Sequence, residues 1–195
     1  MNERLRKQLD FLREIDKSKS VFRQNYLADG SRKENDAEHG WHMALFACIL
    51  QEYFPGADLN RVLPMALMHD LIEIDAGDTY CYDTAGQVGK AEREAAAARR
   101  IYGLLPLEQG EKYLALWQEF EAQETPDAQF AAVLDRIQPL LLQFSSQGKS
   151  WKEHDICTAQ VRERNAVTFR FAPEPIRQLV DGILDEAVRR GYIKP

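Results

Sequence analysis

The chain has 195 residues, 45% hydrophobic and 29% charged, so it is long enough for a packed core and too apolar to be disordered. A net charge of -6 argues against a broad surface for nucleic acid or an anionic membrane. The three cysteines show no CxxC spacing, and an odd number gives no disulfide framework. No apolar stretch approaches the ~20 residues of a membrane span, and no apolar signal region follows the charged start, so we expect a cytoplasmic protein.

Apolar residues recur with the period of an α-helix along most of the chain. Residues 17–34 are expected to form a connection with a turn at Asp29-Gly30, and residues 74–89 a loop rich in Asp, Gly, Tyr and Thr. Two-residue alternation is scarce, so the sequence predicts an all-α single domain over 1–195, with about seven helices. The segments with helical periodicity cover about 3–16, 36–53, 58–73, 89–104, 107–123 and 127–145, and helical patterns resume at about 158–169 and 174–191.

The helix predicted over 36–53 begins with a capping pattern, in which Asn35 caps the helix and Glu38 reaches back. His39 shares a helical stripe with Met43 further along, so it is expected to point inward from the first turn. His42 lies about 60° away around the helix. Either histidine could be functional, or could be a core residue with satisfied hydrogen bonds.

An adjacent pair, His69-Asp70, ends the apolar run of the helix predicted over 58–73, and Glu73 and Asp78 follow it. Histidine and carboxylate side chains are ligands for divalent metals. The simpler interpretation is that His69 caps a core helix while the acids line a solvated loop. A loop as long as 74–89 is more often functional than idle in a compact domain.

Asp135 stands within the apolar helix predicted over 127–145, where a buried carboxylate without a partner is costly. It is either a surface residue paired with Arg136 or Lys149, or an inward ligand. Bundles form metal sites from side chains that converge from several helices, and two imidazoles with two carboxylates suit one divalent ion. Three predicted helices supply such a set: His39, His69, Asp70 and Asp135.

These residues resemble the H…HD…D signature of the HD-domain superfamily of metal-dependent phosphohydrolases, over roughly residues 20–145. The closer resemblance is to the bacterial 5'-deoxynucleotidase-like branch, which shares the two further acids, an arginine before the first histidine, and the stretch that here runs from Arg32 to His39. The resemblance implies an HD-type helical bundle. It also implies one divalent ion (Co, Mn, Ni, Fe, Zn or Mg) held by His39, His69, Asp70 and Asp135, catalytic roles for Glu73 and Asp78, and phosphate binding by Arg23 and Arg32.

The resemblance therefore implies an enzyme that hydrolyses phosphomonoesters, most consistently (deoxy)nucleoside 5'-monophosphates, by attack of a metal-activated water. Gln24 departs from the family, in which an aromatic residue at this position helps to select a deoxyribose, so another small phosphate ester is an alternative. A non-catalytic, metal-stabilised HD module for binding or regulation is a second alternative, against which Glu73 and Asp78 speak. Four histidines are too few for the two-metal cyclic-dinucleotide phosphodiesterases or two-iron oxygenases of this superfamily.

The same resemblance implies a homodimer. It also implies that each subunit binds a small phosphate ester, with no nucleic acid and no membrane involved. Helices within 158–191 are expected to pack on the metal-site core or to form the dimer interface. The apolar stripe of residues 174–191 is wide enough for either role.

Overall fold

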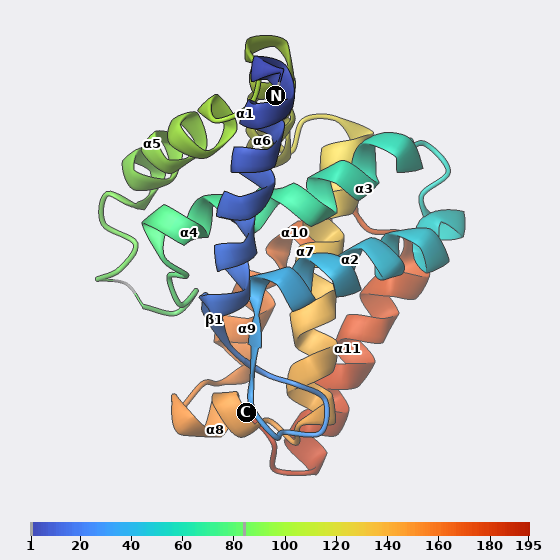
Figure 1. Cartoon of the computed structure of the whole chain (residues 1–195). Coiled ribbons are helices and arrows are strands. Elements are labelled where there is room, and N and C mark those ends of the chain that lie inside the picture. Colours follow the sequence, from blue (N-terminus) through green and yellow to red (C-terminus); the bar gives the residue numbers. More distant parts are fainter. Residues whose placement is uncertain (1, 84) are drawn as a thin grey trace.

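The computed structural model describes residues 2–83 and 85–195; positions 1 and 84, the second within the predicted 74–89 loop, lie outside the described residues. The described chain is mainly helical, which confirms the all-α class (Figure 1). Seven of its α-helices have ten or more residues: α1 (Glu3–Glu14), α2 (Asp36–Leu50), α3 (Leu59–Met68), α5 (Lys90–Gly103), α6 (Leu107–Ala122), α7 (Pro126–Ser145) and α11 (Glu174–Arg189). The shorter ones are α4 (Glu73–Ala76), α8 (Lys149–Glu153), α9 (Thr158–Arg164) and α10 (Ala166–Phe171).

Helix α7 runs through the middle of the molecule, and α2, α3, α6, α10 and α11 pack around it (Figure 1). Thr125 caps its start by accepting a hydrogen bond from the Ala128 amide at 3.2 Å. The side chains of Phe130, Val133 and Leu134 are completely buried. Each such side chain contributes about 1.5–3 kcal/mol by leaving water, so α7 is the centre of the main core.

A second apolar cluster lies between α1, α5 and the turn that follows α3. It includes Phe11, Leu71, Ile101 and Tyr102, all of which are buried. Through this cluster, the segment that follows His69 packs against α1 and α5.

The helix predicted over 58–73 is divided in the structure. Helix α3 ends at Met68, a 3₁₀ turn covers His69–Ile72, and α4 follows. The Tyr102 hydroxyl donates a hydrogen bond to the Met68 carbonyl oxygen at 2.7 Å, which gives that oxygen a partner where the α-helical pattern stops. The prediction of one continuous helix is wrong because the spacing of apolar residues cannot separate an α-helical turn from a single 3₁₀ turn.

Residues 17–34, predicted as a connection, contain most of an antiparallel hairpin of β1 (Phe22–Tyr26) with β2 (Lys33–Asn35). The predicted turn is confirmed, since Gly30 has a φ of 70° and its amide donates to the Leu27 carbonyl oxygen at 2.8 Å. Strands of five and three residues are too short to show alternation in the sequence. The hairpin places Arg23 beside the start of α2.

Helix α11 turns its apolar stripe toward α7. Ile176, Val180 and Leu184 are buried in the main core, whereas Leu179 is exposed. The stripe of residues 174–191 therefore packs within the chain itself, which is the first of the two roles expected for it. Among the described helices, none combines the length and apolar character needed to cross a membrane.

Candidate metal centre

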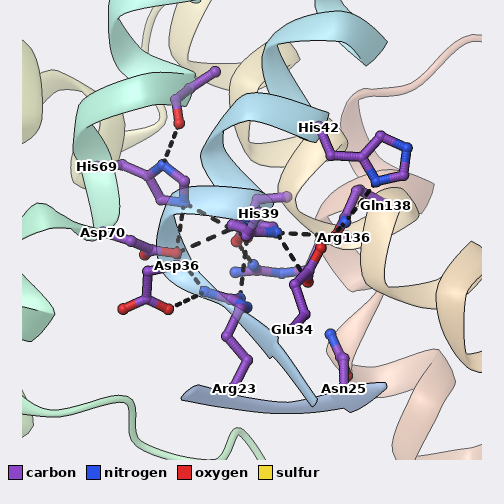
Figure 2. A network of polar contacts seen from close by, with 12 residues as sticks. Arg23, Asn25, Glu34, Asp36, His39, His42, His69, Asp70, Arg136 and Gln138 are labelled. Carbon is purple, nitrogen blue, oxygen red and sulfur yellow. Dashed lines mark hydrogen bonds and ion pairs between the residues drawn. The ribbon is translucent and has the colours of Figure 1, made fainter. Parts of the chain in front are cut away.

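Three of the side chains expected to bind metal, His39, His69 and Asp70, point toward one another from α2 and the turn after α3 (Figure 2). The fourth, Asp135, reaches the same point from α7. The Nε2 atom of His39 lies 3.1 Å from Asp135 Oδ1 and 3.7 Å from Asp70 Oδ2. The Nε2 atom of His69 lies 3.2 Å from Asp70 Oδ2 and 3.8 Å from Asp135 Oδ1. The structure thus brings together residues that are up to 96 positions apart in the sequence.

Local sequence features set the position of His39. The predicted capping box is confirmed, because Asn35 Oδ1 accepts from the Glu38 amide at 3.0 Å and Glu38 Oε2 accepts from the Asn35 amide at 3.2 Å. At Gly40 an added Cβ would lie 3.1 Å from the Ala66 carbonyl oxygen, so glycine permits a close approach of α2 and α3. The rings of His39 and His69 consequently lie 5.4 Å apart, centre to centre.

Hydrogen bonds at the far nitrogen fix both imidazole rings. The Nδ1 atom of His69 lies 3.1 Å from the Ala66 carbonyl oxygen, and that of His39 lies 2.9 Å from Gln138 Oε1. Both oxygens only accept, so each Nδ1 carries a proton and each Nε2 faces the carboxylates. A cation at Nε2, either a proton or a metal ion, is therefore favoured between the rings and the carboxylate oxygens.

The arrangement fits one divalent metal ion. Metal–ligand bonds of roughly 2.0–2.2 Å place two ligands of one ion no more than about 4.4 Å apart. The four nitrogen–oxygen distances, from 3.1 to 3.8 Å, satisfy this limit. Among these four residues, the set whose ligand atoms all lie within 4.8 Å of one another is His39, His69 and Asp70, and Asp135 adjoins this set through the two imidazoles. Burial disfavours the charged form of His69, but the effect of Asp70 and Asp135 is larger and raises the His69 pKa to about 10. The site therefore favours a positive charge at this position, which in the absence of a metal ion is a proton.

Asp135 is buried, which excludes the predicted alternative of a surface aspartate, although the proposed pairing with Arg136 does form. Burial alone would raise the pKa of Asp135, but the Arg136 guanidinium and His39 lower it well below its usual range. For Asp70, likewise, the effect of burial is outweighed by His69 and Arg23, which lower its pKa. Both carboxylates are therefore ionised and available to a cation.

Arg23 reaches the centre from β1. Its guanidinium pairs with Asp70 and lies 3.4 Å from Asp36 Oδ1 (Figure 2). It also lies 4.0 Å from Asp135 Oδ1. Burial alone would lower the pKa of Arg23, but Asp70 and Glu73 raise it, so this residue remains a fixed positive charge beside the candidate ligands.

Glu73 and Asp78 also lie at the centre. One oxygen each of Glu73, Asp36 and Asp70 lie within 4.8 Å of one another, and Asp78 lines the same cavity as Arg23. Burial and the negative charge of Asp70 raise the pKa of Glu73. Burial also raises the pKa of Asp78, with Arg23 opposing that effect. Both acids therefore hold a proton more readily than an exposed carboxyl group does.

Arg32 does not reach the centre. Its guanidinium pairs with Glu38, with a separation of 2.8 Å between Arg32 Nη1 and Glu38 Oε2, and about half of its side chain is exposed. This pairing supports the start of α2 rather than the site, because Glu38 belongs to the capping box. The structure thus brings Arg23 to the candidate centre and leaves Arg32 on the surface.

Three residues at the centre escaped the sequence analysis: Asp36, Glu34 and Gln138. Asp36 is buried against Arg23, and burial together with Asp70 raises its pKa to about 8. The amide nitrogen of Gln138 donates to Glu34 Oε1 at 2.7 Å and also lies 3.0 Å from His42 Nδ1. Gln138 could have been found from its spacing, since it follows Asp135 by one turn of α7.

A cavity opens from this centre between the hairpin, the loop after α4 and the helices that follow α7. Arg23, Asp78 and Asp135 line it together with Gln143 and Arg164. It offers about 80 Å³ to the centres of water molecules, several times the roughly 10–15 Å³ that one water needs. A small organic group attached to a phosphate could therefore extend into it.

Comparisons with known proteins agree with this geometry. A sequence profile described as HD domain matches residues 15–174. The crystal structure of a predicted metal-dependent phosphohydrolase from Magnetospirillum magnetotacticum MS-1 matches all of both chains with a TM-score of 0.90 and 46% identity.

Two named relatives are similar in sequence. The Homo sapiens protein 5'-deoxynucleotidase HDDC2 is 31% identical over 134 residues, which cover 68% of this chain and 65% of that protein, just under two thirds of its length. The Xenopus laevis protein of the same name is 27% identical over 180 residues, which cover 91% of this chain and 86% of that protein. Since the matched profile spans most of its length, this chain belongs to the HD domain family.

Proposed function

We propose that this chain is a metal-dependent phosphohydrolase that cleaves nucleoside 5'-monophosphates, including 2'-deoxynucleotides, into a nucleoside and inorganic phosphate. The observation that carries the proposal is the convergence of two imidazole Nε2 atoms and two ionised carboxylates, with the Arg23 guanidinium beside them and a cavity that Arg23 and Asp135 also line. The candidate ligands are His39, His69, Asp70 and Asp135.

A divalent ion bound there would lower the pKa of a water molecule and polarise a phosphate oxygen. Arg23 is placed to donate hydrogen bonds to the phosphoryl oxygens, where negative charge is spread in the transition state. Asp36 would hold the Arg23 side chain in that direction through their ion pair. Arg32 has no part in this proposal, because its guanidinium is engaged by Glu38.

Hydrolysis moves two protons: the attacking water loses one, and the 5'-oxygen gains one as its bond to phosphorus breaks. Glu73 and Asp78 are suited to this transfer because burial raises the pKa of each carboxyl group. One of them would accept the proton of the water while the other protonates the leaving oxygen. After burial, the largest effect on the pKa of Glu73 is the negative charge of Asp70, which raises it, whereas for Asp78 it is Arg23, which lowers it. These unlike surroundings favour such a division.

The names of the relatives from Homo sapiens and Xenopus laevis support a deoxynucleotide substrate. Gln24 favours a second candidate, another small phosphate ester, because it replaces the aromatic side chain expected at this position. Its amide oxygen accepts a hydrogen bond from Lys33, so it gives the cavity a polar wall.

The deciding experiment measures phosphate release from ribo- and deoxynucleoside 5'-monophosphates, sugar phosphates and an aryl phosphate. The protein is stripped of metal and reloaded with Co, Mn, Ni, Mg, Zn or Fe. Metal-dependent release from nucleotides supports the proposal, with the ratio of deoxy- to ribonucleotide rates defining the sugar preference. Release only from the other esters supports the second candidate. One bound ion per chain with no release from any ester supports a binding module instead.

We also propose a single domain over 1–195, a cytoplasmic location and a homodimer. Exposed apolar side chains on α1 and α2, among them Leu12, Trp41 and Ile49, could bury surface in a dimer. Light scattering coupled to gel filtration tests the dimer by a mass of twice 22.4 kDa.

A further inference from the structure

We propose that the wall of the cavity formed by α7 and α9 is a subsite for the nucleobase of the leaving group, where Gln143 accepts a hydrogen bond from an N–H of the base. This inference rests on the proposed hydrolysis of nucleotides. The wall lies in the same cavity as Arg23, Asp78 and Asp135, so a group attached to a phosphate at the centre extends toward it.

Two buried acceptors on this wall have no partner. The carboxamide oxygens of Gln143 and Asn165 make no hydrogen bond with the described residues, although both side chains are at least 96% buried. A buried polar atom without a partner costs about 1–3 kcal/mol. Such atoms in a cavity are expected to meet a donor from a ligand or a water.

The Gln143 side chain is held so that its oxygen stays free. Its amide nitrogen donates to Asn25 Oδ1 at 2.8 Å, and Asn25 lies on β1, two residues after Arg23. The amide nitrogen of Asn165 similarly donates to the Val161 carbonyl oxygen at 2.9 Å. In both residues the donor end is used by the protein and the acceptor end is left over.

The rest of the wall suits a flat heterocycle. The cavity is lined by the apolar residues Leu140, Trp151 and Val161, and Arg164 also lines it. Nucleobases combine an apolar face with N–H donors and carbonyl or ring-nitrogen acceptors on their edge, and proteins read such edges with carboxamide and guanidinium groups. A sugar phosphate without a base could not use this wall.

The test compares kcat/KM for thymidine 5'-monophosphate with that for 2-deoxyribose 5-phosphate, which has the same phosphate and sugar but no base. We expect wild-type protein to prefer the nucleotide, and Gln143→Met to reduce that preference about tenfold, as loss of one buried hydrogen bond predicts. Gln118→Met, on the exposed side of α6, is the matched control.

Methylation of the base provides a second readout. The N3-methyl derivative of thymidine 5'-monophosphate lacks the N–H donor, so methylation should slow the wild-type enzyme and have little effect on Gln143→Met. Equal preference in wild type and Gln143→Met, with wild type active on nucleotides, overturns the subsite alone. A wild-type protein that releases no phosphate from any ester, the aryl phosphate included, overturns the proposed hydrolysis itself.

Discussion

The Nδ1 atom of His39 lies 2.9 Å from Oε1 of Gln138, which sits one helical turn beyond Asp135 on α7. Both side chains are completely buried, so this contact has no competition from bulk water. It fixes the tautomer that leaves the Nε2 lone pair of His39 facing Asp135 and Asp70. A single helix thus supplies one candidate ligand and the group that orients another.

The first prediction concerns this orienting contact. Replacing Gln138 by Leu removes the acceptor for His39 and should weaken binding of Mn²⁺ or Co²⁺ about 10–100-fold, the usual cost of losing such a partner. Isothermal titration calorimetry of the metal-stripped protein measures the change. The surface variant Gln118→Leu is the control, and an unchanged affinity in Gln138→Leu would show that His39 is oriented without this contact.

Asp135→Asn tests the candidate ligand on α7. Asparagine has nearly the same shape but no charge, so bound metal should fall from one ion per chain to almost none while the helical circular dichroism is retained. Elemental analysis after dialysis gives the stoichiometry. Full occupancy in this variant would remove Asp135 from the proposed ligand set.

The candidate ligands could be predicted from the sequence because each stands out locally. His39 follows a capping box, His69 and Asp70 end an apolar run, and Asp135 interrupts an apolar helix. Residues that act through a contact across the fold had no such local sign. In the sequence Gln138 has the features of any helical residue, and its role follows only from its contact with His39 in the structure.

Arginine was also difficult to place from sequence. Arg23 and Arg32 lie on the same hairpin, and their types and spacing cannot show which one turns inward. The structure separates them through their partners, since Arg23 meets buried Asp36 and Arg32 meets partly exposed Glu38. The 3₁₀ turn at His69 was missed for a related reason, because apolar spacing does not show that the distant Tyr102 hydroxyl donates to the Met68 carbonyl oxygen where α3 ends.

The two arginines give a paired prediction. Arg23→Gln should lower kcat/KM about 10²–10³-fold, because it removes charged donors from the phosphate position. Arg32→Gln should lower it less than twofold, because its guanidinium is bound to Glu38 on the surface. Steady-state phosphate release measures both. Equal losses in the two variants would contradict the placement of Arg32 outside the site.

Glu73→Gln tests proton transfer. The amide keeps the size of the side chain but cannot exchange a proton, so turnover should fall about 10²–10⁴-fold with metal still bound. Asp75→Asn is the matched control on α4, since Asp75 is exposed and paired with Arg100. An active Glu73→Gln variant, with rates near wild type, would exclude Glu73 from the chemical step.

The last prediction is a pH dependence of metal binding. Burial opposes the charged form of His69, but Asp70 and Asp135 raise its pKa to about 10, so the metal-free site holds a proton on this ring at neutral pH. A metal ion must displace that proton, and affinity therefore rises with pH and falls as the solution is acidified. The dissociation constant for Mn²⁺ should decrease about tenfold per pH unit between about pH 6 and pH 8.

Calorimetry in two buffers of different ionisation enthalpy measures this directly, since it counts the protons released with each bound ion. At least one proton per ion is expected at neutral pH from wild-type protein. Asp135→Asn, which lacks one of the carboxylates that raise the His69 pKa, should show no comparable heat of binding. A dissociation constant independent of pH across this range would mean that His69 is already neutral in the metal-free protein, contrary to the effect of its carboxylate neighbours.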